Sequence, residues 1–166
     1  GALAMIAAGA LTLSQASRAM DPSIILSIAA ALAMGAAMQE TGAANLIVDF
    51  ALSTVGGLGP AGMLSAFFLT VALTSNAIST KACAVLFTPI AVGIADALAV
   101  PVAPFAVAVI FASNCAFASP IGYQTNLLVM GPGHYRFADF VRAGLPLIVL
   151  IWLAFSLFAP IFYGLG

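Results

Sequence analysis

Long apolar runs separated by short polar connectors dominate this chain and predict a series of membrane helices. One run covers residues 1–13, and another covers residues 23–38 after a connector that contains Arg18. The last run, residues 144–163, has the length of about 20 residues that an α-helix needs to cross a bilayer. Residues 1–13 show neither a basic leader nor a cleavage site and resemble the end of a helix. We therefore expect this chain to be part of a longer protein.

Residues 43–55 carry polar side chains at every fourth position. Asn45, Asp49 and Ser53 share one face of a helix that is otherwise apolar. This pattern is typical of a helix that lies in the membrane interface. A short connecting helix packed on its neighbours would show the same pattern, and both interpretations stay open.

Residues 60–97 read as two apolar arms joined by a polar tip. The arms, 61–74 and 82–97, are shorter than a full span, and the tip between them ends in Lys81. This pattern predicts a re-entrant hairpin whose tip stops inside the membrane. The alternative is two short spans with Lys81 in an aqueous loop.

Residues 102–131 start as an apolar helix that we expect to run to 118, where Pro120 and Gly122 interrupt it. Irregular backbone at membrane depth is tolerated only where protein buries it or where it lines a wet cavity. Two interrupted segments rich in Ser, Thr and Asn are typical of a transporter binding site. The sequence thus predicts an all-α membrane protein, a polytopic helical bundle with a re-entrant hairpin and a broken transmembrane helix.

Composition and charge agree with a membrane location. Hydrophobic residues make up 64% of the chain and charged residues 5%, whereas a soluble domain carries about 25% charged residues. The net charge of −1 gives no basic field for nucleic acid. With this topology Arg18, Arg136 and Arg142 share one side, which the positive-inside rule makes cytoplasmic. Asp139 and Arg142 are expected to pair on a short surface helix.

The polar residues of the two interruptions suit ion binding and not catalysis. A cation such as sodium needs several oxygen ligands, and unwound helices expose carbonyl groups for that purpose. An anion needs N–H donors, which helices that begin near Ala82 and Asn126 would present. The sequence shows no nucleophile–base pair, phosphate loop or metal cluster. We therefore expect no enzyme and no cofactor, apart from a possible bound sodium ion.

The stretches SNAISTKACAVLFTPIAVGIA (75–95) and ASNCAFASPIGYQTNLLVMGPGHYRF (112–137) resemble the divalent anion/sodium symporters of the ion transporter superfamily. The resemblance covers the C-terminal repeat of that family. It implies two inverted repeats, of which the N-terminal one is missing here, and a homodimer in the membrane, placed in the bacterial inner membrane. It also implies symport of a dicarboxylate, citrate or sulfate with sodium or a proton.

In that family a Ser-Asn-Thr motif at the hairpin tip faces the break in the next helix. Aligning the family's proline with Pro89 places the motif on 79–81, where Thr80 and Lys81 replace the usual Asn and Thr. A second placement, 75–77, begins with the family's first two residues. The resemblance implies substrate contacts at Ser79, Thr80, Lys81, Thr125 and Asn126. It implies cation contacts, largely through backbone oxygens, at Ser75, Ile78, Thr80, Gly122 and Gln124.

Lys81 is the residue on which the interpretations differ most. An ionisable group at membrane depth is a candidate for function, because burying it is costly. It would neutralise a substrate carboxylate or take the place of sodium; otherwise it is an ordinary loop lysine. For the whole chain, the alternatives are an arsenite-type or sodium/proton antiporter of the same superfamily, and a helical scaffold subunit without transport activity.

Overall fold

The computed structural model describes residues 26, 29–30, 33–34, 36–37 and 40–165. The predicted helix 1–13, most of the predicted helix 23–38 and Arg18 lie outside these residues. Within the described part the chain forms helices and no strands. The elements are α4 (Ala43–Val55), the 3-10 turn η1 (Gly56–Leu58), α5 (Gly59–Ser75), α6 (Thr80–Ala97), α7 (Ala103–Ser113), α8 (Gln124–Met130) and α9 (Phe137–Tyr163).

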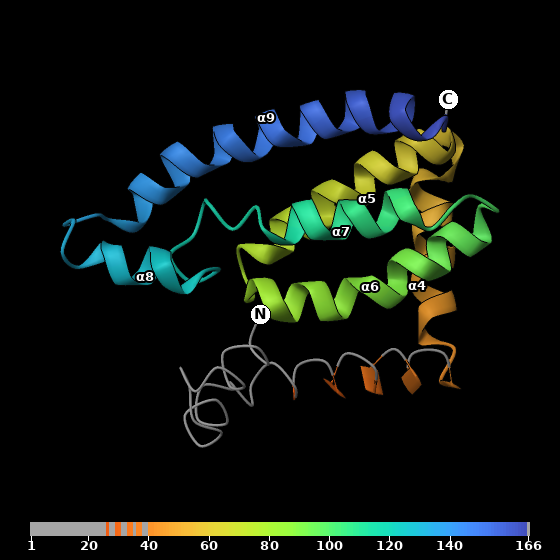
Figure 1. Cartoon of the computed structure of the whole chain (residues 1–166), viewed down its shortest axis with the longest axis horizontal. Coiled ribbons are helices and arrows are strands. Elements are labelled where there is room, and N and C mark those ends of the chain that lie inside the picture. Colours follow the sequence, from red (N-terminus) through yellow and green to blue (C-terminus); the bar gives the residue numbers. More distant parts are fainter. Residues whose placement is uncertain (1–25, 27–28, 31–32, 35, 38–39, 166) are drawn as a thin grey trace, which may run out of the picture.

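Helices α5 and α6 form an antiparallel hairpin, with α7 packed beside both of them (Figure 1). Pro60 stands in the first turn of α5, where a missing backbone N–H costs nothing. At the tip, the Ser79 hydroxyl caps α6 by accepting a hydrogen bond from the Ala82 nitrogen at 3.3 Å. The tip itself is therefore only residues 76–79.

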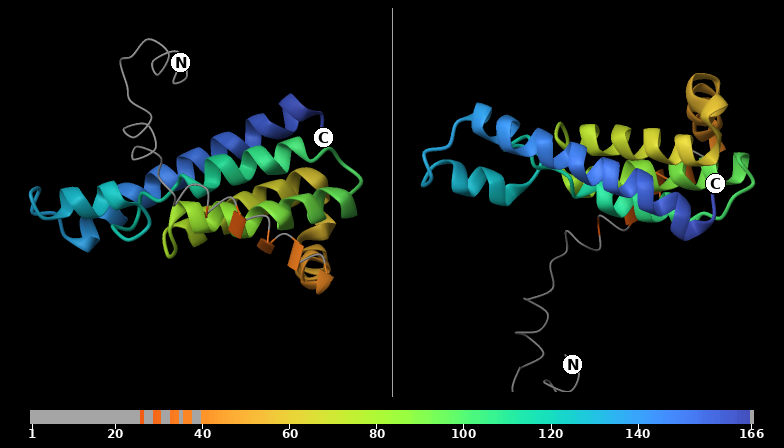
Figure 2. Two further views of the ribbon diagram at one scale, coloured as in Figure 1. Left: turned by 60° about the horizontal axis from the view of Figure 1, so that its bottom comes forward. Right: turned by 90° about the horizontal axis from the view of Figure 1, so that it is seen from above.

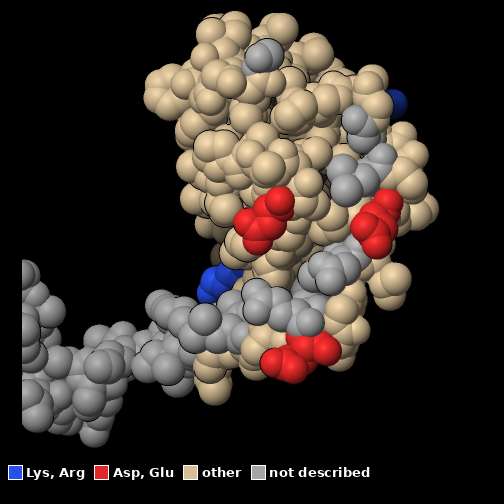
Figure 3. All heavy atoms as spheres, turned by 90° about the vertical axis from the view of Figure 1, so that its right-hand side faces the viewer, with Lys and Arg blue, Asp and Glu red and all other residues tan. Residues whose placement is uncertain are grey.

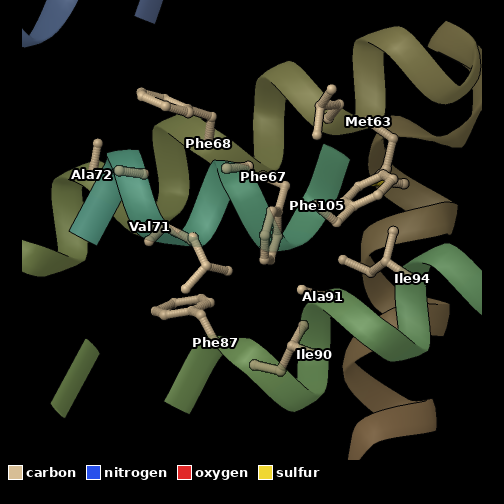
Figure 4. Packing of buried hydrophobic residues seen from close by; sticks show 14 of the residues in the cluster. Met63, Phe67, Phe68, Val71, Ala72, Phe87, Ile90, Ala91, Ile94 and Phe105 are labelled. Carbon is tan, nitrogen blue, oxygen red and sulfur yellow. The ribbon is translucent and has the colours of Figure 1, made fainter. Parts of the chain in front are cut away.

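Aromatic side chains hold the hairpin and its neighbours together. Phe67 of α5 lies with its ring centre 6.0 Å from Phe87 of α6 and 5.8 Å from Phe105 of α7, and the three point toward one another in Figure 4. Phe68, on the next position of α5, stacks on Phe155 of α9 at 4.5 Å. Because α5 contacts α6, α7 and α9, it is the central helix of the bundle.

Helix α9 begins earlier than the predicted 144–163, since residues 137–143 are its first two turns and not a separate surface helix. Asp139 was expected to pair with Arg142. Instead its carboxylate caps the start of α9, where it accepts a hydrogen bond from the Arg136 nitrogen at 2.8 Å. Such a contact satisfies a free N–H at the helix start and so extends the helix into polar sequence.

The broken helix also differs from the expectation. Helix α7 ends at Ser113, five residues before the predicted end at 118, and the chain becomes helical again only at Gln124. Residues 114–123 therefore form a ten-residue loop. Hydrogen bonds from the hairpin tip compete with the helical ones in this stretch, as described below.

Helix α4 crosses the end of the hairpin at a steep angle, turned 114° from α5 (Figures 1 and 2). Val48 is buried against α6, and a Cβ at Gly93 would lie 3.2 Å from its side chain. Asp49 and Ser53 are exposed, as are the apolar Leu46 and Phe50. One side of α4 is thus packed on its neighbours, and its place in the membrane interface stays a prediction.

Two described helices, Thr80–Ala97 and Phe137–Tyr163, are long and apolar enough to cross a membrane. A third crossing results if α4 and α5 count as one bent span. By length and composition the chain is an all-α membrane protein. The hairpin tip ends well inside the length of the molecule, because α8 and the first turns of α9 extend beyond it (Figures 1 and 2).

Apart from Lys81 at the hairpin tip, the charged side chains of the described residues lie toward the two ends of the bundle. Arg136 and Arg142 belong to the start of α9, at the end that also carries α8. Asp96 lies in the last turn of α6 at the opposite end, near α4 with Glu40 and Asp49. That end shows scattered acidic side chains on a largely uncharged surface (Figure 3).

Candidate functional site

The hairpin tip and the loop of the broken helix meet in direct backbone contact. Both the nitrogen and the hydroxyl of Thr80 donate to the Gly122 carbonyl oxygen, at 3.3 and 3.4 Å. A Cβ at Gly122 would lie 2.6 Å from the Ser75 carbonyl oxygen and 2.8 Å from the Cβ of Ala116. Only glycine fits this position, so the glycine that interrupts the helix also allows the two segments to touch.

Asn76 joins the two segments through its side chain. Its Nδ2 donates to the carbonyl oxygen of Ala72 in its own helix at 2.8 Å and to that of Cys115 in the loop at 3.1 Å. Its Oδ1 accepts from the Ala118 nitrogen at 2.8 Å. The amide thereby binds two loop groups that a continuous helix would use for itself, which explains why α7 stops before Cys115.

A second amide folds the loop from its other end. Asn126 of α8 donates to the carbonyl oxygens of Ala116 at 2.8 Å and Ser119 at 3.1 Å. The Ser119 hydroxyl accepts from the Ile121 nitrogen at 3.1 Å. Several polar groups of the irregular loop thus have partners within the protein, as irregular backbone in a membrane needs.

A cavity of about 330 Å³ opens between the tip and the loop. Its walls carry hydroxyl, amide and aromatic groups but no carboxylate. Hydroxyl and amide groups donate hydrogen bonds as well as accept them, so the cavity offers partners to the polar groups of a small ligand. The lining residues are Thr80, Asn114, Ala116, Phe117, Tyr123, Thr125 and Asn126.

The structure brings three of the predicted substrate residues, Thr80, Thr125 and Asn126, into this one cavity. Ser79 lies beside it in the chain, but its hydroxyl is engaged as the cap of α6. Lys81 follows Thr80 with an exposed side chain and is not part of the cavity wall.

The predicted cation residues occupy different positions around the junction. Gly122 and the backbone of Ser75 form the close contact between the segments. The Ser75 hydroxyl is buried and donates to the Ala72 carbonyl oxygen at 2.8 Å, and the Ile78 nitrogen donates to the Thr74 oxygen at 3.0 Å. Gln124 is exposed at the first turn of α8.

Helix α8 begins two residues before the expected start at Asn126 and has only seven residues. The Asn126 side chain holds the loop instead of leading a half-helix. So short a helix has a weak dipole.

Sequence reasoning missed several residues of the cavity and its frame. Asn114, Phe117 and Tyr123 line the cavity, and Asn76 fixes the loop beside it. For Asn76 the sequence offered one signal: the second placement of the tip motif, at 75–77, begins with the pair Ser75-Asn76. For the other three, nothing in their spacing indicates that the loop folds back on the tip.

Comparison with known proteins identifies relatives over almost the whole chain. The family model described as citrate transporter matches residues 1–164. An uncharacterized transporter of Synechocystis sp. is 37% identical over 164 residues, which are 99% of this chain and 27% of the relative. The probable sodium/sulfate cotransporter 3 of Chlamydomonas reinhardtii is 33% identical over 152 residues, 90% of this chain and 16% of the relative. Sodium/sulfate cotransporter 1 of the same alga is 32% identical over 150 residues, 90% of this chain and 17% of the relative. The chain spans about a quarter of the length of these curated relatives, or less.

Proposed function

The chain belongs to the citrate transporter family, and on this premise we propose that it forms half of the binding site of a cation-coupled symporter for a small divalent anion. The family and its named relatives are transporters, not enzymes. Two of these algal relatives are named as a probable and an assigned sodium/sulfate cotransporter, which makes sulfate the first substrate to test and sodium the first coupling ion. Citrate and dicarboxylates are the next candidates.

The observation that carries the proposal is the cavity at the contact of two interrupted membrane segments. Thr80 reaches it from the hairpin, and Thr125 and Asn126 reach it from the broken helix. The Thr80 hydroxyl donates to Gly122, and the Asn126 amide donates to Ala116 and Ser119. These groups are proposed to exchange those partners for a divalent oxyanion when it binds. A wall without carboxylates also avoids repulsion of the anion.

The cation is proposed to lie against backbone oxygens of the same two segments. Residues 76–79 and 114–123 are not helical, so their carbonyl groups are not all directed along a helix axis. Ile78 of the tip and Gly122 of the loop are the proposed backbone contributors, with Ser75 and Gln124 beside them. The Gly122 carbonyl oxygen accepts from the nitrogen and the hydroxyl of Thr80, so cation binding there is proposed to displace one of these bonds. Carbonyl oxygens are hard ligands that suit sodium.

We propose that the Lys81 side chain attracts the anion and does not occupy the position of the cation. Its side chain is exposed at the first turn of α6, one residue after the cavity-lining Thr80. A fixed positive charge near the mouth of a site raises the local concentration of anions and their rate of arrival.

The arrangement in the membrane is proposed from the placement of charges. Arg136 and Arg142 at the start of α9 would face the cytoplasm by the positive-inside rule. The hairpin then enters from outside, and its tip stops at membrane depth. A bacterial inner membrane, a homodimer and a preceding repeat that supplies the other half of the site complete the proposal.

The test is uptake of labelled sulfate, citrate and succinate by the full-length transporter in liposomes, under a sodium or a proton gradient. Thr80→Val is expected to raise the KM for the transported anion. Thr74→Val is its matched control, because the Thr74 hydroxyl donates at 2.8 Å to its own helix. Folded protein that takes up none of these anions, or that exports arsenite or sodium instead, contradicts the proposal.

A further inference from the structure

The last span, α9, touches the loop of the broken helix backbone to backbone. Gly144 is the first buried residue of α9, and Ile148, one turn later, is the next. A Cβ at Gly144 would meet the carbonyl group of Phe117 and would lie 2.5 Å from the Cα of Ala118. These atoms belong to the backbone, so no rotation of a side chain could make room for the added carbon. Gly144 therefore allows α9 to approach the loop as closely as Gly122 allows the hairpin tip to approach it.

The contact lies in the middle of a stretch that two asparagine amides hold in place. Asn76 binds backbone groups of residues 115 and 118, and Asn126 binds those of residues 116 and 119, at 2.8 to 3.1 Å. Gly144 touches the centre of this stretch. Because Asn126 also lines the cavity, the position of residues 115–119 determines the position of a cavity wall.

The two helices on either side of the stretch are joined to each other. The Trp152 indole nitrogen of α9 donates to the Ser65 carbonyl oxygen of α5 at 3.1 Å, and the hydroxyls of Ser65 and Ser156 lie 2.7 Å apart. Asn76 stands at the end of the same helix α5. The loop is thus held between α5, through Asn76, and α9, through Gly144 (Figure 1).

We propose that Gly144 is a positioning residue of the binding cavity, through which α9 fixes residues 115–119 and with them the cavity wall. The proposal rests on the function proposed above and adds the last span to the elements on which anion binding depends. Among the described residues, the cavity lining includes none from α9. The effect of α9 on the cavity therefore passes through the loop backbone and not through a side chain in contact with the anion.

The test compares Gly144→Ala with Ile148→Ala in the full-length transporter in liposomes. Gly144→Ala is expected to raise the KM for sulfate about tenfold, because it displaces the groups that form the cavity wall, and to change the maximal rate less than the KM. Ile148 belongs to the hydrophobic core and not to the cavity lining. Its replacement should lower the Tm and leave the KM unchanged.

Hydrogen exchange of backbone amides gives a second readout, which requires no transport. In purified Gly144→Ala, exchange in residues 115–119 should become about tenfold faster, because the displaced Ala118 nitrogen loses its hydrogen bond to Asn76. The helices α5 and α7 should keep their rates. Ile148→Ala should accelerate exchange in α9 and leave residues 115–119 unchanged, which separates a positioning role from a general loss of packing.

The unsubstituted transporter provides a measurement that does not depend on how well the variants insert. Addition of sodium sulfate is expected to slow exchange in residues 114–123 and also in residues 137–144, since the start of α9 is held against the loop. Slower exchange in the loop alone would overturn the positioning role.

The two proposals fail in different ways. If sulfate, citrate and succinate all leave the exchange rates and the uptake at background, the proposed function is contradicted, and the exchange of Gly144→Ala still decides on the contact. An unchanged KM together with unchanged exchange of residues 115–119 in Gly144→Ala overturns the positioning role. Equal increases of the KM in Gly144→Ala and Ile148→Ala overturn it as well.

Discussion

The side-chain oxygen of Asn76 accepts a hydrogen bond from the backbone nitrogen of Ala118 at 2.8 Å, across 42 positions of sequence. The same amide donates to Cys115 and to its own helix. One side chain therefore holds the hairpin tip and the broken helix together, beside the cavity in which Thr80 and Asn126 meet.

Asn76→Ala is expected to lower the free energy of unfolding by about 2 kcal/mol, because it leaves the Ala118 nitrogen and a loop carbonyl without partners. Anion uptake should fall as well, since the loop residues of the cavity lose their fixed position. Denaturation of the purified transporter and uptake kinetics measure the two effects. Thr74→Val removes a hydrogen bond within one helix and should cost about 0.5 kcal/mol at most. Equal losses in the two variants would show that Asn76 has no special role.

Gly122→Ala is expected to abolish uptake while the protein still inserts in the membrane. The added Cβ would lie 2.6 Å from the Ser75 carbonyl oxygen, which belongs to backbone and has little freedom to move, so the tip and the loop must separate. Gly131→Ala serves as the control, because a Cβ there meets nothing within 4 Å. Normal uptake by Gly122→Ala would mean that the observed contact is not needed for transport.

In the described part of the chain, the apolar runs and the Pro-Gly interruption predicted helices and the presence of a break, because both depend on local sequence. The end of α7 at Ser113 could not be predicted in this way. Residues 114–118 are apolar enough to continue a helix, and the hydrogen bonds from Asn76 that prevent it come from a segment about 40 residues away.

The same reasoning applies to α9 and to the cavity. Residues 137–143 read as a surface segment because they carry charges, yet Asp139 caps the helix and makes them part of it. The sequence pointed to Thr80, Thr125 and Asn126 through their polar clusters. Phe117 could not be identified, since an aromatic residue in an apolar run looks like ordinary packing until a cavity is found beside it.

Trp152→Phe is expected to weaken the contact between α5 and α9 by about 1 kcal/mol. The indole nitrogen donates to the Ser65 carbonyl oxygen at 3.1 Å and to its hydroxyl at 3.0 Å, and that hydroxyl also shares a hydrogen bond of 2.7 Å with Ser156. Thermal unfolding in detergent measures the loss. Phe158→Leu, at an exposed position of the same helix, should have little effect, and a similar loss there would argue against the polar contact as the cause.

Lys81→Gln is expected to raise the KM for the anion roughly two- to fivefold at low ionic strength, with the maximal rate and the sodium dependence unchanged. An exposed charge acts on the anion at a distance, and salt screens it, so the effect should disappear in concentrated neutral salt. Lys81→Arg keeps the charge and should behave as the unsubstituted protein. A Lys81→Gln variant that gains sodium dependence would instead place the ammonium group where sodium binds.

His134→Gly is expected to stabilise the protein, a direction opposite to that of most substitutions. His134 ends the turn after α8 with a φ of +52°, a conformation that costs residues with a Cβ about 1 kcal/mol. Its nitrogen donates to the Gly131 carbonyl oxygen at 3.1 Å, so the turn itself depends on this conformation. Glycine adopts it without strain but loses more entropy on folding, which leaves a net gain of about 0.5 kcal/mol. His134→Ala removes the imidazole and keeps the strain, so chemical denaturation should find the glycine variant more stable than the alanine variant. Equal stability of the two would mean that the left-handed backbone conformation at this position does not determine the energy of the turn.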